Sequence, residues 1–282
     1  MKKIITSIIS LILVLIIIRK LLNKIIKKLI FAPCKKNIKQ YENYLNDEKI
    51  IHETIKTEDN VKLSACLYNS NKKPTYDDKI ILFSHGNSGI LSKVIYTYII
   101  KELSNYGSIF IYDYRGYGDS RGVISDVGTF EDIKAVWNFL IEEKKILPEN
   151  IIIFGHSLGT SISMYLIKYL VEKNKEYPKN VILQNPFYCI KRLAKEIVPM
   201  LAYFVDYKYK TYEFIKFIEK KCKDINIILI HSGDDELIDV QHSHDLKDII
   251  KNNNCNLYIV DGGHNNPIYD KKIYECLKNV CQ

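Results

Sequence analysis

From about residue 50 onward, short apolar runs alternate with segments whose apolar residues recur at helical spacing. The first two runs, IIHETIKT and VKLSACLY, are separated by the turn residues EDN, a pattern that predicts a β-hairpin. Six later runs are predicted strands: KIILFSH, SIFIYDY, NIIIFGHS, NVILQN, INIILIHS and NLYIVDGG. Helices are predicted between and after them, over Leu91 to Leu103, Phe130 to Glu143, Ile162 to Val171, Ser243 to Lys251 and from Tyr269 onward.

The predicted central strands are apolar at every position rather than at every second one. Strands of this kind are buried on both faces, which indicates a mostly parallel sheet covered by helices on its two sides. Neither a repeat nor a linker divides the sequence. We therefore expect one doubly wound α/β domain over residues 41–282, with a short helical cap at about residues 186–222.

The N-terminal segment, residues 1–40, has a different pattern. Ile4 to Ile18 is free of charged residues and lies between Lys2-Lys3 and Arg19-Lys20. As a helix it reaches about 22 Å, against a hydrocarbon core of about 30 Å, and the long side chains of Arg19 and Lys20 can snorkel to the headgroups. The following LLNKIIKKLI places its apolar residues on one helical stripe and its lysines opposite, which is typical of a helix at an anionic membrane surface.

This segment is interpreted as an uncleaved, single-pass N-terminal anchor that contacts the membrane through residues 4–30. A cleaved signal peptide and a buried domain helix remain alternatives, although no small-x-small cleavage site closely follows the apolar run. The heavier positive flank lies C-terminal to the run, so the catalytic domain is expected in the cytosol. Cys34, beside this basic segment, is either a free thiol or a site of S-acylation.

Charge and cysteine content exclude other classes of protein. Residues 1–40 hold ten of the 41 basic residues and no acid, which leaves 31 bases and 33 acids for the domain. A near-neutral domain does not indicate nucleic-acid binding. The seven cysteines include no C-x-x-C pair and no Cys/His cluster at metal-ligand spacing, so a reducing compartment and neither metal nor cofactor are expected.

The sequence IIIFGHSLGT places Ser157 between Gly155 and Gly159, directly after a predicted buried strand and before a predicted helix. A strand that turns sharply into a helix needs glycine where side chains do not fit. The residue at the apex of such a turn is held out into the crevice where open α/β sheets bind ligands. Ser157 is therefore the candidate nucleophile.

A serine nucleophile needs a base and a third group that orients the base. Two later strand ends supply them: IILIHSGDDELID carries Asp234, Asp235 and Asp239, and YIVDGGHNNP carries His264. The order Ser, Asp, His is the one that this topology requires. We predict Asp235 as the acid, with Asp234 as its main rival and Asp239 as a solvated loop residue. The other histidines are interpreted as structural or exposed.

The oxyanion of a tetrahedral intermediate needs backbone N–H donors. Leu158, which follows the nucleophile at a helix N-terminus, is the first predicted donor. The second is predicted in the loop after ILFSHGNSG, at the N–H of Asn87.

At these residues the chain resembles the α/β-hydrolase superfamily, and more closely its Bem-like serine hydrolases and the related membrane-bound protein depalmitoylases. The matching segments are LFSHGNSG, IYDYRGYGDSRG, IFGHSLGTSIS, NPFYCIKRLAK, ILIHSGDDELID and VDGGHN. The resemblance implies a triad of Ser157, Asp235 and His264 with Asn87 and Leu158 as the oxyanion hole. It also implies a structural loop beside the site, shaped by Asp113, Arg115, Gly116 and Gly118.

The aromatic-rich segment PMLAYFVDYKYKTYEFIKF in the predicted cap is interpreted as a wall that binds an acyl chain above Ser157, or as packing between cap and sheet. The sequence thus predicts a membrane-associated hydrolase of esters or thioesters, acting on a hydrophobic acyl substrate in a lipid or an acylated protein. An amidase or peptidase with the same triad and a non-catalytic binding protein remain alternatives. No protein partner is indicated.

Overall fold

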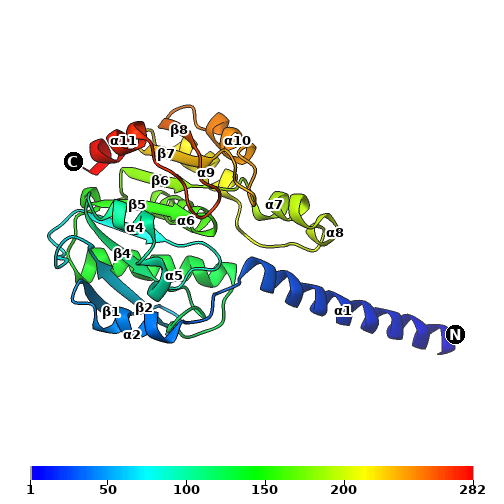
Figure 1. The fold of residues 1–282 in the computed structure, drawn as a ribbon. Helices are drawn as coiled ribbons and strands as arrows, with labels where there is room; N and C mark the ends of the chain where they lie inside the picture. The colour runs from blue at the N-terminus through cyan, green and yellow to red at the C-terminus, as the bar shows by residue number, and fades with distance from the viewer. Residues whose placement is uncertain (1, 282) are drawn as a thin grey trace.

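The fold is seen in a computed structural model that describes residues 2–281, without the side chains of residues 2–12 and 15. Eight strands form one sheet in the order β1-β2-β4-β3-β5-β6-β7-β8 (Figure 1). Their bounds are β1 Ile50–Lys56, β2 Lys62–Tyr68, β3 Ile80–Ser84, β4 Ser108–Tyr112, β5 Ile151–His156, β6 Asn180–Gln184, β7 Asn226–Ser232 and β8 Asn254–Val260. The hairpin β1-β2 joins the rest of the sheet through an antiparallel pairing of β2 with β4, and all other pairings are parallel.

The helices are α1 Lys2–Ile30, α2 Ile38–Asn46, α3 Leu91–Val94, α4 Tyr98–Leu103, α5 Asp126–Asn138, α6 Leu158–Glu172, α7 Ile190–Ile197, α8 Pro199–Ala202, α9 Thr211–Lys221, α10 Gln241–Ile249 and α11 Lys271–Cys281. They cover both faces of the sheet and form two apolar cores. Successive residues of one strand point to opposite faces. In β3, Ile80 and Leu82 enter one core whereas Ile81 and Phe83 enter the other. This explains why the central strands are apolar at every position, and it confirms the predicted α/β class.

The bounds of the predicted helices differ from the observed ones, and two of the differences have a clear local cause. The expected helix over residues 91–103 is two short helices, α3 and α4, because Thr97 is extended and its hydroxyl donates to the carbonyl of Val94. The helix expected from Phe130 begins earlier, at Asp126, because the Ser125 hydroxyl accepts a hydrogen bond from the N–H of Gly128 and caps it.

The N-terminal segment is one long helix, α1, which projects from the domain on the side where α7 and α8 protrude (Figure 1). Within the part of the chain that the structure describes, no helix is both long enough and apolar enough to cross a membrane. Much of the predicted run Ile4 to Ile18 lies outside the described side chains. The prediction of a single-pass anchor is therefore not supported, since the described part of α1 carries Arg19 and Lys20 and then lysines at almost every turn.

The end of α1 is part of the folded domain. Ile26, Ile30 and Phe31 are buried in one of the two cores. The Phe31 ring packs edge-on against Tyr207 and Tyr209, with centroids 5.8 and 6.1 Å away. The boundary predicted at residue 40 thus divides two segments that pack together.

Candidate active site

Ser157 occupies the turn between β5 and α6. Its φ of 52° and ψ of −115° are rarely adopted by residues other than glycine. The backbone packs too closely around this turn for side chains at the neighbouring glycines. A Cβ on Gly159 would lie 1.9 Å from the carbonyl oxygen of Ser84, and a Cβ on Gly155 would lie 2.7 Å from the carbonyl oxygen of Gly159. The Ser157 N–H donates to the carbonyl of Gln184 at 2.9 Å. The turn is thereby fixed at the carboxyl end of the sheet.

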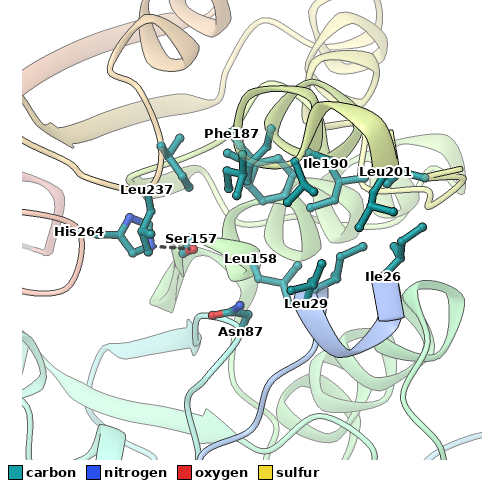
Figure 2. A pocket seen from close by; sticks show the side chains of 17 residues that line it. Ile26, Leu29, Asn87, Ser157, Leu158, Phe187, Ile190, Leu201, Leu237 and His264 are labelled. Carbon is teal, nitrogen blue, oxygen red and sulfur yellow. Dashed lines mark hydrogen bonds between the residues drawn. The ribbon is translucent and has the colours of Figure 1, made fainter. Parts of the chain in front are cut away.

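The three side chains Ser157, His264 and Asp235 form a continuous hydrogen-bonded row. His264 Nε2 lies 2.9 Å from Ser157 Oγ (Figure 2). His264 Nδ1 lies 2.7 Å from Asp235 Oδ2. Ser157 and His264 are 8% and 4% exposed, so bulk water has little access to the row. This arrangement lets the imidazole accept the serine proton while the carboxylate holds its orientation.

The three candidate acids make different contacts, and Asp235 is the one that contacts His264. Asp235 has a buried carboxylate that also accepts hydrogen bonds from the N–H groups of Leu237 and Ile238, at 2.8 and 2.9 Å. Burial alone would raise the pKa of Asp235, but the hydrogen bond and charge of His264 and these N–H groups outweigh it, so the pKa lies below its ordinary value. Asp235 is therefore ionised at neutral pH.

Asp234 and Asp239 accept hydrogen bonds from backbone N–H groups of nearby segments. The exposed Asp234 carboxylate accepts from the N–H groups of Gly262 and Gly263, which precede His264. Asp239 accepts from the N–H of Gln241, the first residue of α10. Neither contacts the imidazole in the structure, whereas Asp235 does.

Asn185 and His156, which were not predicted as site residues, hold the His264 loop in place. The His264 carbonyl accepts from Asn185 Nδ2 at 2.8 Å and lies 3.1 Å from His156 Nε2. Asn185 Oδ1 in turn accepts from the N–H of Ser232, so one side chain ties the acid loop to the histidine loop. Asn185 has a φ of 47° directly after β6. The sequence signal that could have indicated this role is an asparagine, a polar residue that tolerates positive φ, at the end of a predicted strand.

The two residues predicted to form the oxyanion hole line the same cavity as Ser157. Leu158 is the first residue of α6, and the N–H of a first helical residue has no acceptor within its helix. Asn87 is held by its carbonyl oxygen, which accepts from the Tyr117 hydroxyl at 2.8 Å and from the N–H of Ala32 at 3.3 Å. The segment after α1 therefore braces the loop that carries Asn87.

The side chains of the loop after β4 make contacts that hold the loop to neighbouring parts of the domain. Arg115 pairs with Asp132 at 2.8 Å and with Asp59 at 2.7 Å. Asp113 accepts from the N–H of Leu91 at 2.9 Å, and a Cβ on Gly118 would collide with its carboxylate. Gly116 and Gly118 both have positive φ.

An apolar cavity of about 240 Å³ opens beside Ser157 (Figure 2). Ile26 and Leu29 of α1 form one wall, facing Ile190 and Leu201 of α7 and α8 across the space. The other apolar lining residues are Ile30, Leu158, Phe187, Leu193, Ala194, Ile197, Val198, Val205, Leu237 and Ile238. Within the predicted cap, α7 and α8 thus line the cavity, while α9 packs against α6 and α10.

Asn87, Ser157 and His264 are the polar residues of this cavity, so its lining offers neither a charged side chain nor a set of metal ligands among the described residues. A hydrocarbon chain that contacts this lining would lose water from its apolar surface, which is favourable, and would bury no charged side chain. The cavity is therefore suited to an apolar chain whose polar end lies at Ser157.

Comparison with known proteins places the chain in a family. The family model described as serine aminopeptidase, S33, matches residues 76–223. Uncharacterized protein R595 of Acanthamoeba polyphaga mimivirus is 32% identical over 80% of this chain and 80% of its own. Human alpha/beta hydrolase domain-containing protein 17B is 35% identical over 66% of this chain and 60% of its own, so this match spans less than two thirds of the human protein.

Among solved structures, an alpha-beta hydrolase from Vibrio vulnificus superposes with a TM-score of 0.71 at 21% identity, over 89% of this chain and 88% of that one. At this identity the likeness concerns the fold alone. The chain therefore belongs to the serine aminopeptidase S33 family of the α/β-hydrolase superfamily, as its motifs indicated.

Proposed function

We propose that this chain is a serine hydrolase that cleaves ester or thioester bonds of hydrophobic acyl substrates through an acyl-enzyme intermediate. The hydrogen-bonded row of Ser157, His264 and Asp235 at the mouth of an apolar cavity is the observation that carries this proposal. It places a nucleophile, a base and an apolar surface for an acyl chain side by side.

In the first half of the proposed reaction, Ser157 Oγ attacks the substrate carbonyl carbon while His264 Nε2 takes the hydroxyl proton. The carbonyl π electrons move onto the oxygen, which then accepts hydrogen bonds from the N–H groups of Leu158 and Asn87. Collapse of this intermediate breaks the bond to the leaving oxygen or sulfur. His264 returns its proton to that atom, and the acyl group remains on Ser157.

In the second half, a water molecule gives a proton to His264 Nε2 and attacks the acyl carbon. The new intermediate collapses, Ser157 Oγ leaves and regains the proton, and a carboxylic acid is released. Asp235 keeps its charge throughout and stabilises the imidazolium that forms in both halves.

An ester or thioester is favoured over a peptide with a free amino terminus. An aminopeptidase needs an anionic group to hold the substrate amine. Among the described residues, no Asp or Glu lines the apolar cavity or the polar cavity on which Ser157 also borders. The aliphatic lining instead matches an acyl chain.

The proposal includes contact with a membrane surface through α1, as expected for residues 4–30. Leu13, Leu21, Ile25 and Leu29 are each about half exposed, beside the basic residues of the same helix. An apolar stripe flanked by lysines and arginine favours the surface of an anionic bilayer. Since Ile26 and Leu29 also line the cavity, substrate from such a surface would enter near α1.

A fluorophosphonate probe tests the catalytic proposal, because it phosphonylates only an activated serine. We expect the intact protein to be labelled and Ser157→Ala to remain unlabelled. Ser243→Ala is the matched control, since that serine is also buried and contacts a histidine, His231, but lies outside both cavities. Labelling that persists in Ser157→Ala, or its absence from the intact protein, contradicts the proposal.

A further inference from the structure

Ser157 borders a second cavity, of about 280 Å³, whose lining is more polar than that of the apolar cavity. Asn87, Ser157 and His264 line both this space and the apolar cavity. A substrate whose carbonyl carbon lies at Ser157 has two substituents on that carbon, the acyl chain and the leaving group. If the acyl chain fills the apolar cavity, the leaving group is directed into the polar one.

Amide and hydroxyl groups of Ser88, Thr97, Gln184, Asn265 and Asn266 line this polar cavity, beside the apolar side chains of Phe83, Val94 and Ile99. Among the residues that the structure describes, Lys93, in α3, is the one with a permanent charge that lines this cavity. No carboxylate lines this cavity, and none of the ion pairs among the described residues involves Lys93. Lys93 is a half-buried residue that lines the cavity and has no described ion-pair partner, so its side chain is available to an anion there.

We infer that the polar cavity is the leaving-group subsite and that Lys93 selects leaving groups that carry an anionic group, such as a carboxylate or a phosphate. This inference rests on the proposed hydrolase function and adds the chemistry of the second half of the substrate. Removing both ions partly from water strengthens their attraction relative to bulk solution. Asn265 and Asn266 line the same cavity, and the NH₂ group of each amide is a further hydrogen-bond donor there.

Two matched substrates test the subsite: nitrophenyl octanoates that carry on the ring either a carboxylate or, as the neutral isostere, a carboxamide. We expect the intact protein to prefer the carboxylate about 10-fold in kcat/KM, which is a difference of about 1.4 kcal/mol. Lys93→Gln should bring the ratio close to one, and Lys93→Glu should invert it. Lys101→Gln, which removes an exposed lysine that lies outside the cavity, should leave the ratio unchanged.

A ratio near one in the intact protein, or a preference that survives Lys93→Gln, overturns the inference while the hydrolase function stands. If neither ester is cleaved, the hydrolase function fails instead. Binding then still tests the subsite: calorimetric titration of Ser157→Ala with the ring-carboxylate nitrophenol should show binding that Lys93→Gln weakens about 10-fold. Equal binding by the two proteins would refute the role of Lys93.

Discussion

The Tyr117 hydroxyl donates a 2.8 Å hydrogen bond to the carbonyl oxygen of Asn87, the residue whose N–H is proposed to stabilise the oxyanion. The same carbonyl accepts from the N–H of Ala32, just after α1. A donor that must be aligned before the reaction begins gains from such bracing, because preorganised donors need no rearrangement when charge develops. The proposed oxyanion hole is thus tied both to the loop after β4 and to the N-terminal segment.

We predict that Tyr117→Phe lowers kcat about 3- to 10-fold and leaves KM nearly unchanged, since the brace acts on the intermediate rather than on substrate binding. The measurement is steady-state hydrolysis of a nitrophenyl ester. Tyr98→Phe is the control, because it also removes one tyrosine hydroxyl bond, to Tyr274, at an exposed position. A pure rise in KM for Tyr117→Phe would refute the positioning role.

Substitution of the two adjacent aspartates should separate their roles. Asp235→Asn should lower kcat by on the order of 10³- to 10⁴-fold, because the amide no longer stabilises the imidazolium and favours the wrong tautomer of His264. Asp234→Asn should cost less than about 10-fold, since its carboxylate braces only the N–H groups of Gly262 and Gly263. Nitrophenyl ester turnover measures both, with circular dichroism as a check of folding. Equal losses in the two variants would contradict the assignment.

The wall of the apolar cavity formed by α1 should control acyl-chain length. Leu29→Trp places a larger side chain in this space, so it should reduce kcat/KM for dodecanoyl esters at least about 10-fold and for butanoyl esters by less than about 2-fold. Leu21→Trp is the matched control, on an exposed part of the same helix that does not line the cavity. A chain-length profile that Leu29→Trp leaves unchanged would exclude this cavity as the acyl site.

The buried carboxyl of Asp113 should make stability depend on pH. Burial raises the pKa of Asp113 to about 7, despite the hydrogen bond from the N–H of Leu91. Burial lowers the pKa of the nearby His85 to about 4, so its imidazole is mostly neutral above about pH 4. An acid with a raised folded pKa binds more protons folded than unfolded, so its contribution to stability falls as the pH rises from about 4 to 7.

Asp113→Asn removes this titration. The free energy of unfolding of the variant relative to the native protein should therefore increase between about pH 5 and pH 7 and level off above. Urea unfolding midpoints at those pH values and at about pH 8 measure it. A difference between the two proteins that stays constant across this range would show that Asp113 does not titrate there.

The turn around Ser157 should tolerate no side chain at Gly159. Gly159→Ala would place a Cβ 1.9 Å from the backbone carbonyl oxygen of Ser84, and backbone cannot move aside as a flexible side chain can. We expect a loss of more than about 4 kcal/mol in the free energy of unfolding, or no soluble protein. Gly233→Ala is the control, because its Cβ would lie 3.2 Å from the side chain of Ile259 and 3.8 Å from the Val260 carbonyl oxygen, which is an ordinary contact distance. A soluble Gly159→Ala protein of native stability would contradict the described turn.

The sequence by itself determined the class of fold and the order of the candidate catalytic residues. Runs that are apolar at every position predict strands buried on both faces, and the glycines around Ser157 predict a sharp strand-to-helix turn. Both signals are local. The first depends on how often apolar residues recur along a strand, and the second depends on the room for side chains at a single turn. Where a local signal was weak, as at Thr97 and Ser125, the predicted helix bounds were wrong.

Tertiary structure alone decided which side chains meet. Asp234 and Asp235 differ by one position in the sequence, but the backbone of their loop directs one carboxylate to the glycine N–H groups and the other to His264. The apolar residues near the end of α1 were interpreted as membrane contacts. Ile26 and Ile30 instead complete a core and a cavity that α7 and α8 leave open. An apolar stripe on a helix has the same pattern whether lipid or protein covers it, so only the packed structure distinguishes the two.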